Sequence, residues 1–304
     1  MSDEQALARA RLSLEGLSLG DSLGAFYEMY HAIEMVPIIK ARELPAPEWG
    51  FTDDTNMALS IYESLRRHGE IHQDELCDSF VAHFENTAKF GYGPGVIRFV
   101  DAVKKGMTWQ TANQQLFKGG SFGNGGAMRI NPLGAYFADD FDKLVSETIK
   151  ATEITHAHPE GIAGAITVAV ATAIAWQHHN APLMRGDFIE KVLPYIPKSD
   201  VYQNCLLAQK LPSVEYGAID EVVRQIGNGG AITAQDSVPY VLYCAGENLH
   251  DFENAFWLTA SGGGDVDTTC AMVCGIVAVS VGADKLPTEW LNRREPLPDW
   301  AFIG

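Results

Sequence analysis

Apolar positions recur at helical spacing along most of this chain. Directly after Thr52-Asp53-Asp54, the apolar residues Met57, Ile61 and Leu65 occupy every fourth position and Gly69 follows them, which predicts one amphipathic helix. Comparable helical patterns or alanine-rich runs cover residues 74–84, 95–105, 141–152, 159–178, 201–211, 216–226, 236–248 and 268–282. Alternating patterns typical of β-strands are nearly absent, and no repeat with a period of about 20–50 residues is visible. The pattern therefore predicts an all-α fold.

One of these runs, Gly161–Trp176, is apolar around its whole circumference. Such a helix is expected at the centre of a protein, enclosed by other helices, and its glycines and alanines would allow close contacts. This run and residues 270–282 are shorter than the roughly 20 residues of a membrane span, so we expect two buried helices. No linker rich in Ser, Pro or Gly divides the chain, which predicts a single large helical domain over residues 1–304.

Composition and charge narrow the class of partner. The 304 residues include 22 Lys and Arg against 39 Asp and Glu, a formal net charge of −17, and 46% are hydrophobic. This is the composition of a soluble globular protein, and its negative field disfavours nucleic acids and anionic membranes as partners. The five cysteines form no C-x-x-C pair, and the polar N-terminus lacks the apolar core of a secretory signal. We therefore expect a reducing, cytoplasmic location.

Glycine-rich or polar segments interrupt the helical patterns. We expect them to form irregular loops, and loops held by a rigid scaffold are common positions for binding and catalytic groups. These segments are residues 20–28, 51–55, 91–95, 119–129, 155–161 and 261–269.

Two acidic clusters stand at predicted helix N-termini, Thr52-Asp53-Asp54 and Asp265-Val266-Asp267-Thr268. Helix capping is one explanation, because Asp and Thr side chains accept hydrogen bonds from first-turn N–H groups. However, each cluster supplies three oxygen-bearing side chains, a set suited to Mg²⁺, Mn²⁺ or Ca²⁺. If the clusters meet, two carboxylates about 4 Å apart repel by roughly 4 kcal/mol at an effective dielectric of 20. Two divalent cations would nearly balance the charges of these four aspartates and Glu28.

The other polar segments allow several interpretations. Gly123-Asn124-Gly125-Gly126 and Gly262-Gly263-Gly264 could form concave anion sites from backbone N–H groups, or simply tight turns. Neither segment matches a P-loop. His156 and His158 could bind a ligand, transfer protons or form structural hydrogen bonds, and Pro159 is well placed to begin a helix.

One competing motif has the wrong context. Asp265-x-Asp267-x-Thr269 resembles the D-x-D-x-T motif of haloacid-dehalogenase-like phosphatases, whose first Asp is a nucleophile. That motif follows a buried β-strand near the start of an α/β domain. Here it lies near the C-terminal end of a helical chain, which argues against a phosphatase of this type.

Taken together, the motifs resemble those of the ADP-ribosylglycohydrolase family. They occur in the family's order and span residues 20 to 268, and although each is weak alone, the ordered set is specific. The matching segments are Gly20-Asp21-x-x-Gly24 with Glu28, Thr52-Asp53-Asp54-Thr55, Gly123-Asn124-Gly125-x-x-Met128-Arg129, Thr155-His156 and Gly263-Gly264-Asp265-x-Asp267-Thr268.

This resemblance implies an all-α fold with two Mg²⁺ or Mn²⁺ ions in a central cleft. By matching motif positions, Thr52, Asp53 and Asp54 would bind one ion, Asp265 and Thr268 the second, and Asp267 both. The resemblance makes Glu28, Asp54 and Asp267 the catalytic candidates, and it leaves open which carboxylate transfers protons. The residues expected to contact ADP-ribose are Tyr92, Ser121, Gly123, Asn124, Gly125 and His156.

The resemblance also implies the reaction. A member of this family would cleave the glycosidic bond between ADP-ribose and a protein side chain, through an oxocarbenium-like transition state. Arginine and serine linkages are the first expectations, with an ADP-ribosylated protein as substrate and ADP-ribose as product. The alternative is a binding or immunity protein that recognises ADP-ribose, or blocks a cognate ADP-ribosyltransferase, without relying on turnover.

Overall fold

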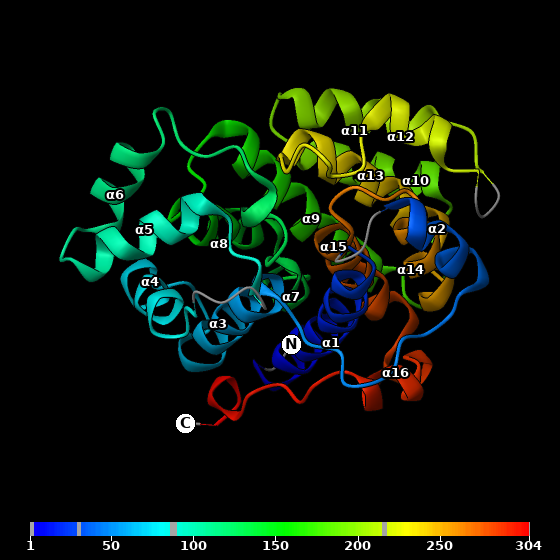
Figure 1. Cartoon of the computed structure of the whole chain (residues 1–304). Helices are drawn as coiled ribbons and strands as arrows, with labels where there is room; N and C mark the ends of the chain where they lie inside the picture. The colour runs from blue at the N-terminus through cyan, green and yellow to red at the C-terminus, as the bar shows by residue number, and fades with distance from the viewer. Residues whose placement is uncertain (1–2, 29–31, 86–89, 215–217, 304) are drawn as a thin grey trace.

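The protein is described by a computed structural model that covers residues 3–28, 32–85, 90–214 and 218–303 (Figure 1). Within these ranges the regular elements are all helical, and only two isolated β-bridges occur, Trp49 with Arg294 and Gly123 with Thr233. The predicted all-α fold is confirmed. The α-helices are α1 Asp3–Glu28, α2 Ala32–Ala41, α3 Asp53–His68, α4 Gln73–Ala82, α5 Pro94–Lys104, α6 Trp109–Leu116, α7 Asn131–Tyr136, α8 Phe141–Glu153, α9 Pro159–Gln177, α10 Arg185–Val192, α11 Asp200–Lys210, α12 Asp220–Ile226, α13 Ala234–Glu247, α14 Phe252–Ala260, α15 Val266–Val281 and α16 Thr288–Arg293.

The two apolar runs, residues 161–176 and 270–282, correspond to the buried helices α9 and α15. Helix α9 packs against α7, α8, α13 and α15, and α15 also packs against α1 and α14. Helix α9 is long and apolar enough by composition to cross a membrane, but 78% of its most apolar stretch is buried inside the protein. This burial agrees with the predicted enclosed helix. Each predicted helix corresponds to an observed one, although residues 216 and 217 of the predicted 216–226 helix lie outside the described ranges.

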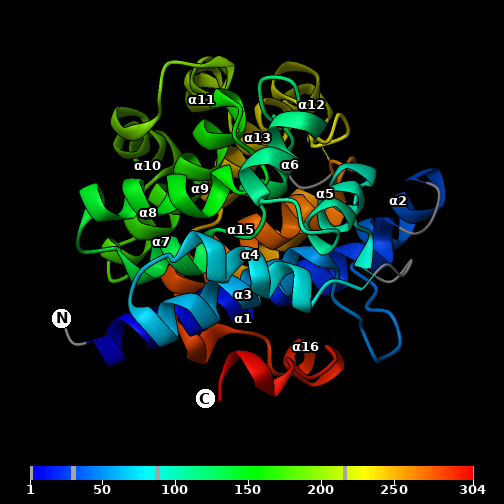
Figure 2. The same ribbon diagram turned by 90° about the vertical axis from the view of Figure 1, so that its left-hand side faces the viewer.

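The segment 20–28 corrects one prediction, because it is not a loop. It forms the last turns of α1, which lies along α15 and beside α3 at the centre of the molecule (Figures 1 and 2). A Cβ atom added at Gly20 would lie 2.2 Å from the carbonyl oxygen of Cys270, and one added at Gly24 would lie 2.7 Å from the Cα of Asp267. These glycines therefore allow two helices to touch, and the contact outweighs their low helix propensity.

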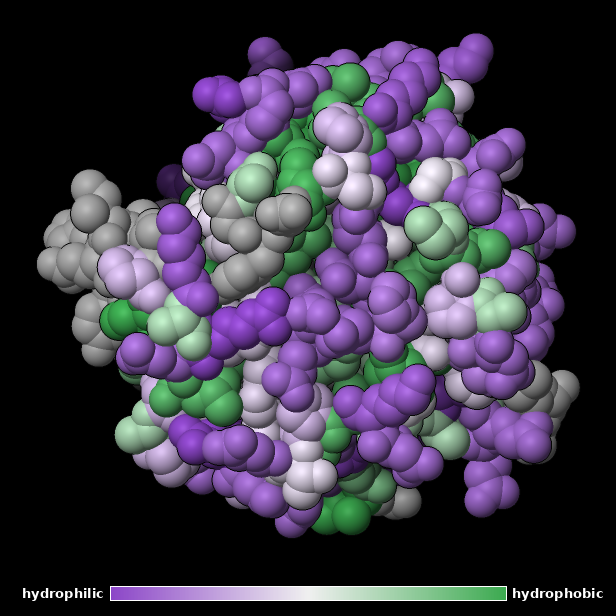
Figure 3. All heavy atoms as spheres, turned by 90° about the vertical axis from the view of Figure 1, so that its right-hand side faces the viewer, coloured by the Kyte–Doolittle hydropathy of each residue, from purple (hydrophilic) through white to green (hydrophobic). Residues whose placement is uncertain are grey.

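The face shown in Figure 3 is mostly hydrophilic, with hydrophobic residues in separate patches. Large hydrophobic side chains are nevertheless exposed at a few described positions, and two of them, Phe122 and Ile232, belong to segments that form the cavity described next.

Candidate active site

The first turn of α3 is fixed by a carboxylate of α1. Asp21 is fully buried, and its Oδ2 and Oδ1 atoms accept hydrogen bonds from the backbone N–H of Thr52 (3.0 Å) and from the Thr52 hydroxyl (2.8 Å). The backbone N–H of Thr55 (3.1 Å) and its hydroxyl donate to the same carboxylate. These bonds set the orientation of Asp53 and Asp54, which lie between the two threonines. Asp21 belongs to the first motif, Gly20-Asp21-x-x-Gly24, but its position in the sequence predicted no role for it.

The two acidic clusters meet in space. One oxygen from each of Asp21, Asp54 and Asp267 lies within 4.8 Å of the others, and the same holds for Glu28, Asp265 and Asp267. The Thr268 hydroxyl also donates to Asp54 Oδ2 at 3.3 Å. Asp267 belongs to both groups, so it connects the α3 cluster to the α15 cluster.

Capping explains only part of these clusters. Thr52 is the N-cap of α3 and accepts a hydrogen bond from the backbone N–H of Asp54 at 3.4 Å. Asp265 occupies the N-cap position of α15, but its side chain makes no capping bond and instead accepts one from the Asn124 side-chain amide. The Asp265 side chain is therefore directed toward the 119–129 segment, whereas Asp267 accepts a hydrogen bond from the backbone N–H of Thr268 in its own helix.

The carboxylates of the two acidic clusters disfavour one another's charged forms. Burial and the neighbouring carboxylates raise the pKa values of Asp54 and Asp267 well above their ordinary range. Partial desolvation and the charge of Asp267 raise the pKa of Glu28 to about 8. Within the described ranges, Asp54 Oδ1 is buried and has no hydrogen-bond partner. An oxygen-only set with an unpartnered buried oxygen and excess negative charge fits hard divalent cations.

A cavity of about 370 Å³ lies over these groups, within the usual size range of small-molecule sites. One side is acidic and carries Glu28, Asp53, Asp265 and Asp267, with Thr268 beside them. The lining also includes Ser121, Gly123, Asn124, Gly125 and His156, and the two sets meet where the Asn124 amide donates to Asp265.

Three predicted residues are not on the cavity wall. Thr52 and Asp54 lie behind it, bonded to Asp21 and Thr268 as described above. Tyr92 is buried, and its hydroxyl accepts a hydrogen bond from the Asn56 amide at 2.7 Å. The flanking glycines of that loop, at positions 91 and 93, line the cavity instead.

The glycine-rich wall packs against a neutral histidine. A Cβ atom at Gly125 would come within 2.7 Å of His156 Cε1, so this position requires glycine. His156 Nδ1 lies 2.7 Å from the Thr155 hydroxyl, and burial lowers the pKa of His156 to about 3. The ring is therefore uncharged at neutral pH. His158, by contrast, caps α9 by accepting a hydrogen bond from the backbone N–H of Glu160.

Sequence analysis overlooked a second glycine-rich loop, residues 227–233. The letters GNGGA occur at 123–127 and again at 227–231, and this repetition could have identified it. The two loops pair, since the backbone N–H of Asn124 donates to the Ile232 carbonyl and that of Ala234 to the Phe122 carbonyl. Ile232 lines the cavity and is 64% exposed.

The cavity also has an apolar side that sequence analysis did not single out. It includes Val96 and Phe99 of α5 and Phe117, which directly follows α6. These residues gave no distinctive sequence pattern, because apolar residues at helical spacing usually belong to a core.

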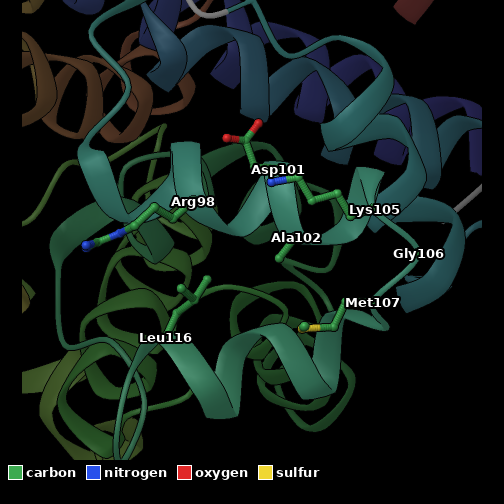
Figure 4. Close-up of a pocket in the computed structure, with 7 residues that line it drawn as sticks. All are labelled: Arg98, Asp101, Ala102, Lys105, Gly106, Met107 and Leu116. Carbon is green, nitrogen blue, oxygen red and sulfur yellow. The ribbon is translucent and has the colours of Figure 1, made fainter.

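A second hollow, about 560 Å³, lies between α5 and α6 and is shown in Figure 4. Its lining carries a single carboxylate, Asp101, and in Figure 4 this group points away from the Arg98 guanidinium. Among the described residues that line it, there is neither an acidic cluster nor a pair of glycine loops. The acidic cavity is therefore the candidate active site.

Comparisons with known proteins agree with this geometry. The ADP-ribosylglycohydrolase family profile matches residues 2–302. The chain is 26% identical to human (Homo sapiens) ADP-ribosylhydrolase ARH3 over 334 residues, covering 96% of this chain and 90% of ARH3. It is 25% identical over 306 residues to ADP-ribosylarginine hydrolase Tri1 from Pseudomonas putida (strain GB-1), covering 96% of this chain and 76% of Tri1.

A solved structure shares the fold. It is described as an ADP-ribosylglycohydrolase-related protein complex, and it matches with a TM-score of 0.66 at 21% identity over 96% of this chain and 94% of its own. At that identity the likeness concerns the fold alone.

Proposed function

Because the chain belongs to the ADP-ribosylglycohydrolase family, we propose that it hydrolyses the glycosidic bond between ADP-ribose and a modified protein side chain. Arginine and serine linkages are the first candidates, and one relative is named an ADP-ribosylarginine hydrolase. Because a shared fold does not itself establish an activity, the site must support the proposal. The supporting observation is that Asp267 joins both acidic groups at a cavity whose lining also includes the glycine-rich segment 123–125.

The acidic side of the cavity would hold two divalent cations, Mg²⁺ or Mn²⁺. Asp267 would contact both, since it belongs to both groups of converging oxygens. The unpartnered Oδ1 of Asp54 supports this assignment. When bound, such cations supply positive charge for ribose hydroxyls and lower the pKa of an attacking water. The other proposed ligands are Thr52, Asp53, Asp265 and Thr268.

The remaining walls suggest how ADP-ribose would lie. Its diphosphate would face the backbone of Gly123–Gly125, whose N–H groups can bind an anion. Its base would contact the apolar side formed by Val96, Phe99 and Phe117. This orientation directs the distal ribose, which carries the reacting carbon, toward Glu28 and the aspartates.

Glu28 is the proposed proton donor. It lies at the cavity wall, and the backbone N–H of Asp267 donates to its Oε2 atom at 3.2 Å. Without bound cations, burial and the charge of Asp267 raise the pKa of this carboxyl group to about 8, which favours its protonated form. It could thus protonate the departing side-chain nitrogen or oxygen as the glycosidic bond breaks. Asp267 would orient the ribose and the water, and Asp54, behind the wall, would help to hold a cation.

The test uses peptides that carry ADP-ribose on arginine or on serine. Purified protein with Mg²⁺ or Mn²⁺ is expected to release ADP-ribose from at least one of them, and EDTA is expected to stop the release. Mass spectrometry of the peptides and of free ADP-ribose would measure both outcomes. Failure to release ADP-ribose from either linkage with either metal would refute the proposed activity.

The comparisons do not favour the alternative of a binding or immunity protein, because the relatives described above are named as hydrolases. Calorimetry with ADP-ribose, set beside turnover, would separate the two functions. Tight binding without product would support the alternative.

A further inference from the structure

A second group of metal-ligating side chains lies at the turn between α3 and α4. His68 is the last residue of α3, His72 precedes α4 as its N-cap residue, and Glu75 lies in the first turn of α4. Gly69, with a φ of +69°, reverses the chain between the two helices. Because α3 rises about 1.5 Å per residue, this group is roughly 22 Å from Asp53 at the other end of the helix.

The three side chains converge on one point. One ligand atom from each of His68, His72 and Glu75 lies within 4.8 Å of the others. His68 Nε2 is 2.9 Å from Glu75 Oε2, and His72 Nδ1 is 3.4 Å from Glu75 Oε1. Ligands of a tetrahedral Zn²⁺ ion, with bonds of about 2.0–2.2 Å, lie about 3.3–3.6 Å apart. Because the two histidine rings stack, one ring must turn out of the stack to direct its in-plane lone pair at the ion.

The second nitrogen of His72 also has a partner. While Nδ1 faces Glu75, Nε2 lies 3.3 Å from Glu70 Oε1. In metalloproteins a ligating histidine usually donates its other N–H to a carboxylate, which fixes the ring and its tautomer. We propose that His68, His72 and Glu75 bind a Zn²⁺ ion, with Glu70 orienting His72 and water completing the coordination.

Ion pairing alone explains this arrangement less well. Hydrogen bonds with Glu75 and Glu70 raise the pKa of His72, which favours one imidazolium. The His68 ring stacks on it with centroids 4.3 Å apart and planes inclined by 17°, so a second imidazolium charge would be repelled. The side chains are 22%, 43% and 49% exposed for His68, His72 and Glu75, and exposed ion pairs contribute little stability. With one ring turned out of the stack, the two imidazoles would instead offer lone pairs to a single cation.

The ligand chemistry separates this site from the central cavity. Two imidazole nitrogens and one carboxylate suit Zn²⁺, whereas the all-oxygen set around Asp267 suits Mg²⁺ or Mn²⁺. Zinc at the turn would connect the end of α3 to the start of α4. The site would therefore stabilise the turn, and its function does not depend on hydrolysis of ADP-ribose.

The test measures metal binding directly. Protein without a polyhistidine tag is dialysed against Zn²⁺ in excess Mg²⁺ at about pH 8, where histidine is neutral, and bound zinc is counted by atomic emission. Wild-type protein is expected to retain about one more zinc ion per chain than His72→Gln. Glu70→Gln is expected to weaken binding by about tenfold or more. Replacing zinc by Co²⁺ should give the intense visible absorption of a low-coordinate nitrogen site.

Two control variants locate the bound metal. Asp267→Asn should leave the zinc stoichiometry and the Co²⁺ spectrum unchanged, which excludes the central cavity as their source. His250→Gln, at an exposed histidine outside the cluster, should also bind zinc as wild type does. Zinc should raise the thermal midpoint of the wild type but not that of His72→Gln, and circular dichroism would check that the variant is folded. Equal zinc retention by wild type and His72→Gln would overturn the proposal.

Discussion

The carboxylate of Asp21 accepts hydrogen bonds from both the backbone N–H and the hydroxyl of Thr52, 31 residues further along the chain. Thr55 donates to it in the same two ways. Helix α1 thereby fixes the first turn of α3, and this turn carries Asp53 and Asp54 toward the acidic cluster of α15. Asp21 is thus a positioning residue for the proposed metal ligands.

Replacing Asp21 by Asn should reduce both stability and activity. A carboxylate only accepts hydrogen bonds, whereas an amide must direct one NH₂ group toward donors of Thr52 or Thr55. We expect Asp21→Asn to lower the free energy of unfolding by about 1–3 kcal/mol, measured in urea. Mn²⁺ affinity should fall as well, because the turn of α3 is displaced. An unchanged Mn²⁺ affinity would mean that Asp21 does not position the cluster.

The contact between α1 and α15 should tolerate no side chain at Gly24. The added Cβ of Gly24→Ala would lie 2.7 Å from Asp267 Cα, which must move the start of α15. We expect a loss of about 1–3 kcal/mol in unfolding free energy, together with weaker metal binding. Gly186→Ala is the matched control, because nothing lies within 4 Å of its added Cβ and it sits in α10. The control should be neutral or slightly stabilising; a similar loss in both variants would contradict this explanation.

Asp267→Asn should separate activity from stability. Asp267 belongs to both groups of converging oxygens, so its loss should lower ADP-ribose release by at least about 100-fold and abolish Mn²⁺ binding by calorimetry. Without metal, the variant should unfold at the same or a higher temperature, because one of several repelling carboxylates is gone. Asp284→Asn, at an exposed position, should change neither property. Retention of Mn²⁺ binding by Asp267→Asn would count against the proposed ligand set.

The stability of the protein in EDTA should fall as pH rises. Glu28 has an ordinary pKa of 4.5, and its value in the folded protein is about 8, while burial raises the pKa of Asp265 to about 6. The folded state thus holds protons that the unfolded state has released, and this contribution to stability is lost as pH rises through the folded values. The thermal midpoint should decrease by several degrees between about pH 5 and 8, and Mn²⁺ should offset the decrease. A thermal midpoint that rises over this pH range in EDTA would show that these carboxylates do not dominate the pH dependence of stability.

Much of the fold could be predicted because helix formation is local. The fourth-position spacing of Met57, Ile61 and Leu65 identified α3, and Gly69 ends it in a left-handed conformation as expected. The apolar run of α9 likewise indicated a buried central helix. Periodicity could not identify the end of α1, because Gly20 and Gly24 are unfavourable within an isolated helix. These glycines are needed because α1 touches Cys270 and Asp267 there, and both residues are distant in sequence.

By itself, the sequence determined which side chains are available and on which helix ends they lie: the oxygen ligands at the starts of α3 and α15, and the glycine-rich 119–129 segment. Only the tertiary structure decided which of them meet. It brings Asp54 within hydrogen-bond distance of Thr268, turns Tyr92 away from the cavity, and pairs the two GNGGA loops. The physical reason is that helix propensity and capping act between near neighbours, whereas convergence on one cavity depends on how closely α1 and α15 pack.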